Sequence, residues 1–423
     1  MPAKPSSEVS ELYPSVQQEI ANLCASAEIR SAFTWFRTQE PQFAQWQLEL
    51  ARIAAPPFGE GARSVWLAER FKDLGLDSIH TDEVGNVFGT HGGYGHGYVS
   101  LSAHLDTVFP AGTPLNIRQQ GSRLYGPGVS DNGAGVTAIL AMAAVLQARG
   151  LRHALPLLFI GNVGEEGEGD LRGMRHIFSA PRWKDSIHYS LVLDGAGSDT
   201  IVAEALGSRR FEVIVRGPGG HSWSDFGAPN PIVVLARAIQ AFTDTPVTVS
   251  PKTTFNVGVI RGGTSVNSIP ESASMRVDIR STSMAEMERL ERALRYALDQ
   301  AVEEQSQASS AHASPASSGR RPFGLSHELV PIGNRPAGEL HPSAHIMQVI
   351  RAVDVQLGNS AQVQRASTDA NIPLSLGLEA IAIGGGGAGG GAHTLQEWFD
   401  CSGRELGLKR ILLTLLGLAG KAR

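Results

Sequence analysis

Seven side chains that could hold a metal ion or move a proton each follow a short apolar segment or stand in a glycine-rich turn. They are His104, Asp106, Asp131, Glu165, Glu166, Asp194 and His393. Singly each is a weak signal, because a lone histidine is more often a core or surface residue and an aspartate before a helix is often an N-cap. Five of them supply two imidazoles and three carboxylates, a set that suits Zn²⁺, with Mn²⁺ or Co²⁺ as alternatives: His104, Asp131, Glu166, Asp194 and His393. Three carboxylates and a hydroxide would nearly offset two divalent cations, so a dinuclear site is predicted if these side chains converge.

Convergence follows from the predicted strands. Apolar runs at residues 98–103, 155–162, 189–193 and 380–383 are typical of buried strands, and residues 135–147 predict a buried crossover helix. The alternation of strands and helices predicts an α/β domain, with a mostly parallel sheet and helices on both faces. Such sheets place ligands at the carboxyl ends of their strands. Because the candidate side chains follow those ends, we expect them in one cleft.

Two turns have competing interpretations. Glu165, Glu166 and Glu168 stand together after a strand, where carboxylates repel unless a cation or a shared proton is present; a solvated loop is the alternative. The glycine run at 384–391 could be a phosphate loop, but no Gly-Lys-Ser/Thr sequence and no helix pattern follows it. We interpret it as a tight turn that lets His393 point inward.

The pattern changes near Arg209. Predicted strands at 211–216, 254–261, 272–280 and 328–332, with helices at 231–242 and 285–304, follow the βαββαβ order of a ferredoxin-like α+β unit. The earlier pattern resumes after Pro336 with a predicted helix at 343–357.

The domain organisation expected from this change is an insertion. A lid or dimerisation domain at 208–335 would interrupt a catalytic domain formed by 1–207 and 336–423. The Ser- and Ala-rich stretch 306–319 is expected to be a mobile loop within the insertion.

These segments resemble the co-catalytic zinc peptidases and deacylases, a family that includes peptidase T, carboxypeptidase G, aminoacylase and succinyl-diaminopimelate desuccinylase. The resemblance rests on LSAHLDTVFP, YGPGVSDNGAG, LLFIGNVGEEGEGDLRG, the aspartate after YSLVL, and GGGGAGGGAH. It extends from about Trp46 to the C-terminus and is closest to peptidase T-like members. It implies a zinc-exopeptidase-like fold with two Zn²⁺ per subunit.

The resemblance also implies which residues hold which ion. His104 and Asp194 would hold one metal, and Glu166 and His393 the other. Asp131 would bridge the two ions, and the peptide bond after it would be cis.

Catalytic roles are implied for two neighbouring carboxylates. Glu165 would be the general base that takes a proton from the attacking water and passes it to the leaving amine. Asp106 would orient His104 without contacting a metal.

Three residues of the inserted domain complete the implied site. His221, in RGPGGHSW, would reach the partner subunit's site and stabilise the oxyanion. Asn267 and Arg280, in NSIPESASMRVDIR, would contact the substrate's carboxylate. From the residues alone, His221 would be a surface-loop histidine and Arg280 an ordinary strand-end charge.

The expected function is hydrolysis of a peptide bond in small peptides. In the resembled family the position of Asp194 is aspartate in aminopeptidases and dipeptidases, which favours a di- or tripeptidase. An N-acyl-amino-acid deacylase or a carboxypeptidase is the alternative. The expected partners are therefore a small peptide or an N-acyl amino acid, and a second copy of the chain bound through the inserted domain.

Composition excludes other classes. The 423 residues carry a net charge of −5 with no basic excess, so neither nucleic acid nor an anionic membrane surface is an expected partner. The only cysteines in the sequence are Cys24 and Cys401, which form no disulfide or Cys-x-x-Cys pattern. Residues 1–13 have no apolar stretch of the kind found in signal peptides, and no run of about 18 apolar residues occurs. A cytoplasmic protein is therefore expected. A serine hydrolase lacks support because no Gly-x-Ser-x-Gly turn occurs. A non-catalytic binding protein would be expected to have lost Glu165 or a ligand.

Overall fold

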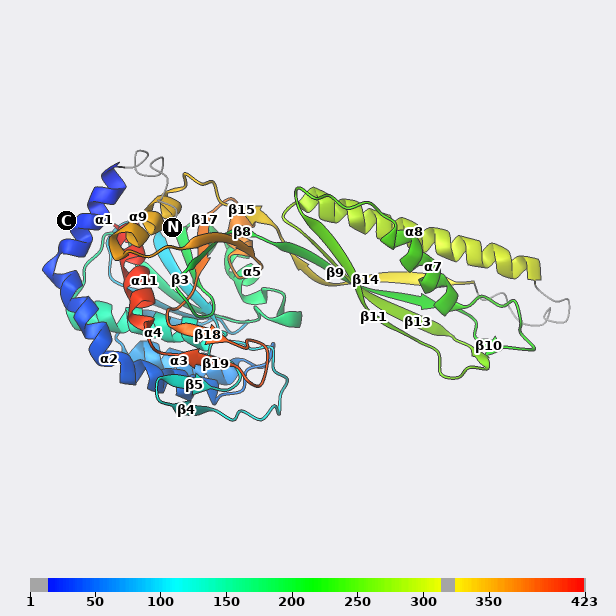
Figure 1. Ribbon diagram of the computed structural model, residues 1–423, viewed down its shortest axis with the longest axis horizontal. Coiled ribbons are helices and arrows are strands. Elements are labelled where there is room, and N and C mark those ends of the chain that lie inside the picture. Colours follow the sequence, from blue (N-terminus) through cyan, green and yellow to red (C-terminus); the bar gives the residue numbers. More distant parts are fainter. Residues whose placement is uncertain (1–13, 313–323, 422–423) are drawn as a thin grey trace, which may run out of the picture. The chain divides into compact units, whose positions relative to one another are not determined.

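The computed structural model describes residues 14–312 and 324–421 (Figure 1). The chain forms two compact units. Unit 1 consists of Met1–Ala205 and Glu339–Arg423, and unit 2 of Leu206–Gly338. Unit 2 begins two residues before the expected 208 and ends three after the expected 335. The features expected at 1–13 and 313–319 lie outside the described residues.

Unit 1 is built on a nine-stranded sheet. Its strands are β1 (Asp77–Thr81), β2 (Val87–His91), β3 (Tyr98–His104), β6 (Leu157–Asn162), β7 (Ile187–Leu193), β8 (Thr200–Ala205), β15 (Gly338–Glu339), β16 (Gln362–Ala366) and β17 (Glu379–Ile383). Their order is β1-β2-β6-β3-β7-β17-β8-β15, with β16 also paired to β8. The four central strands, β6, β3, β7 and β17, are parallel to one another. The predicted α/β class with a mostly parallel sheet is confirmed.

Helices cover both faces of this sheet. One face packs against α1 (Pro14–Ala25), α2 (Ala27–Ala51), α3 (Gly61–Asp73), α4 (Gly133–Arg149), α9 (His345–Leu357) and α11 (Arg404–Ala419). The other packs against α5 (Arg172–Ser179), α6 (Pro181–Lys184) and α10 (Asn371–Ser375). Side chains alternate between the two faces along a strand, so Phe159 of β6 joins the first core while the next residue, Ile160, joins the second. Burial on both faces explains why the central strands read as continuous apolar runs.

The predicted crossover helix is α4, two residues longer at each end than expected. Asn132 caps its start, with its side chain accepting a hydrogen bond from the Gly135 N–H, and Gly150 ends it in the left-handed conformation at φ 58°. The helix therefore begins directly after Asp131.

A small second sheet in unit 1 was not predicted. It contains β4 (Arg118–Gln120), β5 (Arg123–Tyr125), β18 (Ala388–Gly390) and β19 (Trp398–Asp400), in the order β18-β19-β5-β4. Pairing of β19 with β5 joins the hairpin that carries His393 to the segment that precedes Asp131.

Unit 2 has the predicted ferredoxin-like order. Its elements are β9 (Gly207–Arg216), α7 (Pro231–Thr243), β11 (Thr253–Gly262), β13 (Ser272–Ser281), α8 (Met284–His312) and β14 (Ser326–Arg335). The antiparallel sheet runs β11-β13-β9-β14, and both helices pack on it around one apolar core. A two-residue pair, β10 (Gly220–His221) and β12 (Ser268–Ile269), lies beside it.

The prediction of a loop at 306–319 is partly wrong, because α8 continues to His312. Ala and Gln favour helix, and the Ser306 hydroxyl donates to the Val302 carbonyl one turn earlier, which keeps that serine compatible with the helix. The start of the Ser- and Ala-rich stretch at 306 therefore does not coincide with the end of α8.

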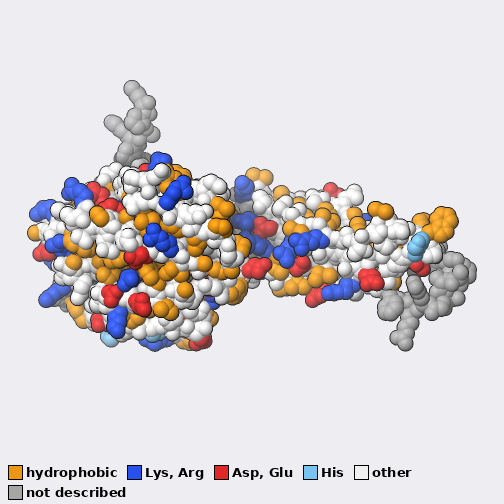
Figure 2. All heavy atoms as spheres, turned by 90° about the horizontal axis from the view of Figure 1, so that it is seen from below, with side chains coloured by type: hydrophobic (Ala, Val, Ile, Leu, Met, Phe, Trp, Pro, Cys, Tyr) orange, Lys and Arg blue, Asp and Glu red, His pale blue; other side chains and the backbone are white. Residues whose placement is uncertain are grey.

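Surface features add two observations. Basic and acidic side chains are interspersed over unit 1 on the face shown in Figure 2, so this face has no extended basic stripe. Among the described residues, no helix combines the length and apolarity needed to cross a membrane.

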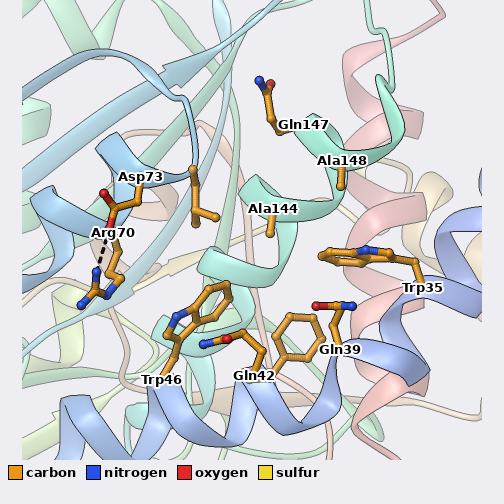
Figure 3. A pocket seen from close by; sticks show the side chains of 11 residues that line it. Trp35, Gln39, Gln42, Trp46, Arg70, Asp73, Ala144, Gln147 and Ala148 are labelled. Atoms are coloured by element: carbon orange, nitrogen blue, oxygen red, sulfur yellow. Dashed lines mark hydrogen bonds and ion pairs between the residues drawn. The ribbon is translucent and has the colours of Figure 1, made fainter.

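A groove of about 380 Å³ lies between α2, α3 and α4 (Figure 3). Its walls include Trp35, Phe43 and Trp46, with the Arg70–Asp73 ion pair at one side. None of the expected metal ligands lines it, so it is separate from the site described next.

Candidate metal centre

The carboxyl ends of the four central strands meet at one edge of the unit 1 sheet and carry most of the candidate ligands. His104 is the last residue of β3, Glu165 and Glu166 follow β6, and Asp194 follows β7. The Asp194 N–H donates to the carbonyl of Ile383, the last residue of β17, at 2.9 Å. Parallel register therefore gathers side chains that are far apart in the sequence.

Asp131 lies between two pairs of these residues. Its Oδ1 is 3.2 Å from Nε2 of His104, which is itself 3.8 Å from Oδ1 of Asp194. Its Oδ2 is 3.1 Å from Nε2 of His393, which is 2.9 Å from Oε1 of Glu166. The structure thus brings all five expected ligands together, in two groups that share one carboxylate.

The two groups satisfy the geometry of metal binding. Ligand atoms of His104, Asp131 and Asp194 lie within 4.8 Å of one another, as do those of Asp131, Glu166 and His393. The combination of His104, Glu165 and Glu166 meets the same criterion, which places the Glu165 carboxylate beside both groups. The first group is the more enclosed, since the side chain of His104 is 2% exposed and that of His393 is 55% exposed.

Backbone geometry is unusual at the two expected ligands that stand in loops, Asp131 and His393. The Asp131–Asn132 peptide bond is cis, as the family resemblance implied. His393 has φ 67°, in the left-handed region that non-glycine residues seldom occupy. Its turn is closed by the Thr394 N–H and hydroxyl, both of which donate to the Gly391 carbonyl.

Asp106 connects two of the strand ends. Its carboxylate accepts the backbone N–H groups of Glu165 and Glu166 at 3.0 and 2.7 Å. Nδ1 of His104 is 3.1 Å from the Asp106 backbone carbonyl and 3.6 Å from its Oδ1. The shorter contact of His104 is therefore with the main chain of Asp106, while the carboxylate fixes the turn that presents the two glutamates.

The excess of carboxylates controls protonation at the site. Burial opposes a charged His104, yet the nearby carboxylates of Asp106, Asp131 and Asp194 hold its pKa well above the usual range. The bond to Asp131 is the main cause that raises the pKa of His393 to about 9. Burial, together with the negative charge of Asp131 and Asp106, raises the pKa of Glu166. These residues therefore concentrate negative charge that protons or cations must balance.

The donor set fits two divalent cations. Histidine nitrogen and carboxylate oxygen are the ligands that Zn²⁺ accepts in catalytic sites. Oδ1 of Asp131 is buried and, among the described residues, makes no hydrogen bond, although it faces His104. A buried carboxylate oxygen without a donor is costly unless a cation is bound.

The inserted unit separates its three candidate residues. His221 pairs with Ser268, and the Ser222 N–H donates to the Asn267 carbonyl at 3.0 Å, so His221 and Asn267 lie together. Arg280 is eight residues along β13 from Ser272, which corresponds to roughly 26 Å at the rise of a strand. One chain therefore does not bring Arg280 beside the other two, and its guanidinium instead donates to Asp278.

Three further buried residues around the site were missed by the sequence reasoning. Glu397 accepts backbone N–H groups from the loop that carries Asp131. Arg63 donates to the carbonyl of Leu105, between His104 and Asp106. Only Glu397 had a sequence signal, since it stands four residues after a candidate ligand.

Asp369 is the third missed residue. Its Oδ2 accepts a hydrogen bond of 2.6 Å from the Asn162 side chain at the end of β6, and burial raises its pKa to about 7. It precedes α10 and follows no predicted strand, so no strand-end pattern marks it in the sequence.

The fold and the ligand clusters place the chain among α/β proteins built around a metal centre. The chain belongs to peptidase family M20/M25/M40, whose family model matches residues 100–416.

Curated relatives of the chain carry different names. It is 31% identical over 223 residues to a probable carboxypeptidase of Aspergillus clavatus, a match that covers 46% of this chain and 47% of the relative. It is 27% identical over 276 residues to a succinyl-diaminopimelate desuccinylase of Xanthomonas oryzae pv. oryzae, covering 60% and 73%. The chain thus spans about half the length of the first of these relatives.

Solved structures share the fold over nearly the whole chain. The aminopeptidase PepT from Bacillus cereus ATCC 10987 superposes with a TM-score of 0.70 at 20% identity, covering 90% of this chain and 99% of that one. A dinuclear metal binding peptidase of the M20 family from Bacillus subtilis superposes with a TM-score of 0.63 at 13% identity, covering 90% and 99%. At these identities the likeness concerns the fold alone.

Proposed function

We propose that this protein hydrolyses an amide bond in small peptides, using two divalent cations held by His104, Asp131, Glu166, Asp194 and His393. The observation that carries the proposal is the Asp131 carboxylate, whose two oxygens face two different histidines at 3.2 and 3.1 Å. His104 and Asp194 would hold one cation, and Glu166 and His393 the other. Zn²⁺ is the proposed metal because its preferred ligands match this set.

Glu165 is the proposed general base. The cations would lower the pKa of an attacking water and polarise the substrate carbonyl. The Glu165 carboxylate, beside both ligand groups, would accept the proton of that water and donate it to the leaving amine. Its backbone is held by the Asp106 carboxylate, which limits the positions that its side chain can reach.

The residues of unit 2 suggest a homodimer. Arg280 lies about 26 Å along β13 from Ser272, the end of the strand nearer to Asn267 in the chain, so a small substrate could contact all three candidate residues of this unit only if they came from different subunits. We propose that His221 acts in the partner's site, where it stabilises the oxyanion, and that Asn267 and Arg280 bind the substrate carboxylate. Exposed apolar side chains stand within five residues of His221 or Asn267 in the chain, which suits a contact of this region with another surface: Trp223, Phe226 and Val266.

Substrate class separates two versions of the proposal. Asp194, rather than glutamate, favours a di- or tripeptidase through the family resemblance. The names of the curated relatives favour the second candidate, a carboxypeptidase or an N-acyl-amino-acid deacylase. Both would use the same metal centre and differ in whether the substrate has a free α-amino group.

One assay tests the proposal and separates its versions. Purified protein is given Zn²⁺ and offered a tripeptide and the N-acetylated form of the same tripeptide. An aminopeptidase-type di- or tripeptidase should cleave only the free peptide, a carboxypeptidase should release the C-terminal residue of both, and a deacylase should release acetate from the modified one. Removal of metal with a chelator should abolish either reaction, and Zn²⁺ should restore it. Activity that survives complete metal removal would overturn the proposal.

A cytoplasmic location is proposed as well. Cys24 and Cys401 are both free thiols, and Cys401 is buried beside Arg404. Proteins kept in a reducing compartment commonly retain such thiols.

A further inference from the structure

Glu397 is a buried carboxylate that contacts the metal-binding loop without facing a metal ligand's side chain. It is fully buried, at 0% exposure. Its Oε1 accepts the N–H groups of Ser130 and Asp131 at 2.7 and 2.8 Å, and its Oε2 accepts that of Gly128 at 2.8 Å. Three charge-assisted bonds to one short segment are more than helix capping or solubility requires.

The main chain strengthens the same connection. The Gly126 N–H donates to the Glu397 carbonyl at 2.9 Å, and the next residue, Trp398, pairs with Tyr125 between β19 and β5. On the other side of the loop, the Gln47 side chain donates to the Val129 carbonyl. Residues 126–131 are therefore held by donors and acceptors on both sides.

The position of Glu397 in the chain gives these bonds a consequence for the metal centre. It lies four residues after His393, in the turn between β18 and β19, while the loop that it binds ends at Asp131. Nε2 of His393 and Oδ2 of Asp131 are 3.1 Å apart. Without the bonds of Glu397, the loop that ends at Asp131 and the turn that carries His393 could move independently, and the separation of these two side chains would change.

We propose that Glu397 is a positioning residue that sets the separation of Asp131 and His393, and with it the affinity of the cation that His393 holds. This inference rests on the proposed metal centre. Loss of an outer contact that orients metal ligands typically weakens metal binding or activity by about 10 to 100-fold. The cation held by His104 and Asp194 should be affected less, because only its shared ligand, Asp131, lies in a loop that Glu397 holds, whereas the other cation depends on both Asp131 and His393.

The three donors require an acceptor at each carboxylate oxygen. Glu397→Gln replaces one oxygen with an amide that donates, so at least one buried N–H would face another donor. Glu397→Ala leaves all three N–H groups without this partner. The two variants should therefore weaken the same ion to different extents, with alanine the stronger.

The experiment titrates metal-free full-length protein with Co²⁺, followed by absorbance, and with Zn²⁺ in competition with a chromophoric chelator. Glu397→Gln should bind one of two ions about 10 to 100-fold more weakly and the other within about threefold of wild type. Glu405→Gln is the control, because its carboxylate pairs with Lys409 on α11 at 3.2 Å, outside the β19–β5 pairing that joins the two loops. It should leave both affinities unchanged.

A merely structural role predicts a different result. Unfolding of the metal-free variants would then occur at lower denaturant while both metal affinities of the folded protein stayed at the wild-type value, and that result would overturn the inference. If Glu397→Gln and Glu397→Ala do not fold, Glu397→Asp keeps the charge on a side chain one methylene shorter and is measured in the same way. Failure of all three to fold would assign Glu397 to folding and also reject the inference. Because the readout is metal affinity, a protein that binds two ions but hydrolyses no peptide would reject the proposed function alone.

Discussion

Nε2 of His393 lies 3.1 Å from Oδ2 of Asp131, although 262 residues separate the two in the chain. The other oxygen of the same carboxylate faces His104 at 3.2 Å. A single side chain thus joins the two halves of the ligand set, and its removal should have a larger effect than that of a ligand belonging to one half.

Asp131→Ala should therefore reduce the binding of both cations. Loss of a shared ligand should cost more than the roughly 10 to 100-fold that follows loss of an outer contact. Metal content after dialysis, measured by elemental analysis, checks the prediction. Asp73→Asn, which alters only a surface ion pair with Arg70, is the control. Retention of two tightly bound ions by Asp131→Ala would contradict the bridging role.

Glu165→Gln should keep both metals and lose turnover by about 10² to 10⁴-fold, the usual contribution of a positioned general base. Glu168→Gln is a matched control three residues later, on an exposed side chain, and should keep full activity. Steady-state kinetics and metal analysis are measured on the same preparations. Undiminished turnover of Glu165→Gln would remove Glu165 from the mechanism.

Subunit exchange tests the role of His221 in the partner's site. Inactive His221→Ala and inactive Glu165→Gln proteins are mixed under conditions in which exchange is shown independently. If His221 acts across the interface, a heterodimer combines both changes in one site and leaves the other intact, so up to half of the wild-type activity per dimer returns. Without recovery despite proven exchange, the assignment to the partner's site is lost.

Acidification should destabilise the protein partly through His153. Burial lowers the pKa of this histidine, whose Nδ1 donates to the Leu155 carbonyl and whose Nε2 accepts from His91. Since its folded-state pKa is below the unfolded value of about 6.5, the unfolded state binds more protons between those values. This contribution to stability is complete above about pH 6.5 and declines as the pH falls through the folded-state pKa.

The slope due to His153 cannot exceed about 1.4 kcal/mol per pH unit, the limit for one proton. Urea unfolding of wild type and His153→Gln from pH 7.5 to pH 5 checks this, because contributions common to both proteins cancel in the difference. The gap between their unfolding free energies should narrow as the pH falls. A constant gap would show that His153 does not titrate between these states.

The sequence predicted the parts of the site that follow simple strands. His104 and Asp194 come directly after an apolar run and Glu166 four residues after the end of one, and parallel strands share one edge, so their convergence could be inferred without coordinates. Asp131 and His393 stand in loops, and their assigned roles as metal ligands depended on the family resemblance.

What the sequence did not predict depends on long-range backbone contacts. Glu397 acts on N–H groups 266 to 269 residues earlier, and every residue has such a group, so no side-chain pattern marks the partner. Strands β4, β5, β18 and β19 are three residues each, too short for alternation to be recognised. The three helices before residue 74 were also missed; α2 even contains Pro41, which usually ends a helix.

The place of β17 in the sheet has a consequence for synthesis of the chain. This strand lies between β7 and β8, both of which precede the inserted unit, while β17 itself follows it by about 40 residues. During translation the ribosome therefore releases β7 and β8 well before the strand that separates them, and the whole of unit 2 can fold in the interval. Until residues 379–383 emerge, β7 and β8 each present an unpaired edge, which is the state most open to wrong pairing or to a chaperone. The nascent protein should thus be most prone to aggregation late in its synthesis, after most of its sheet is already made.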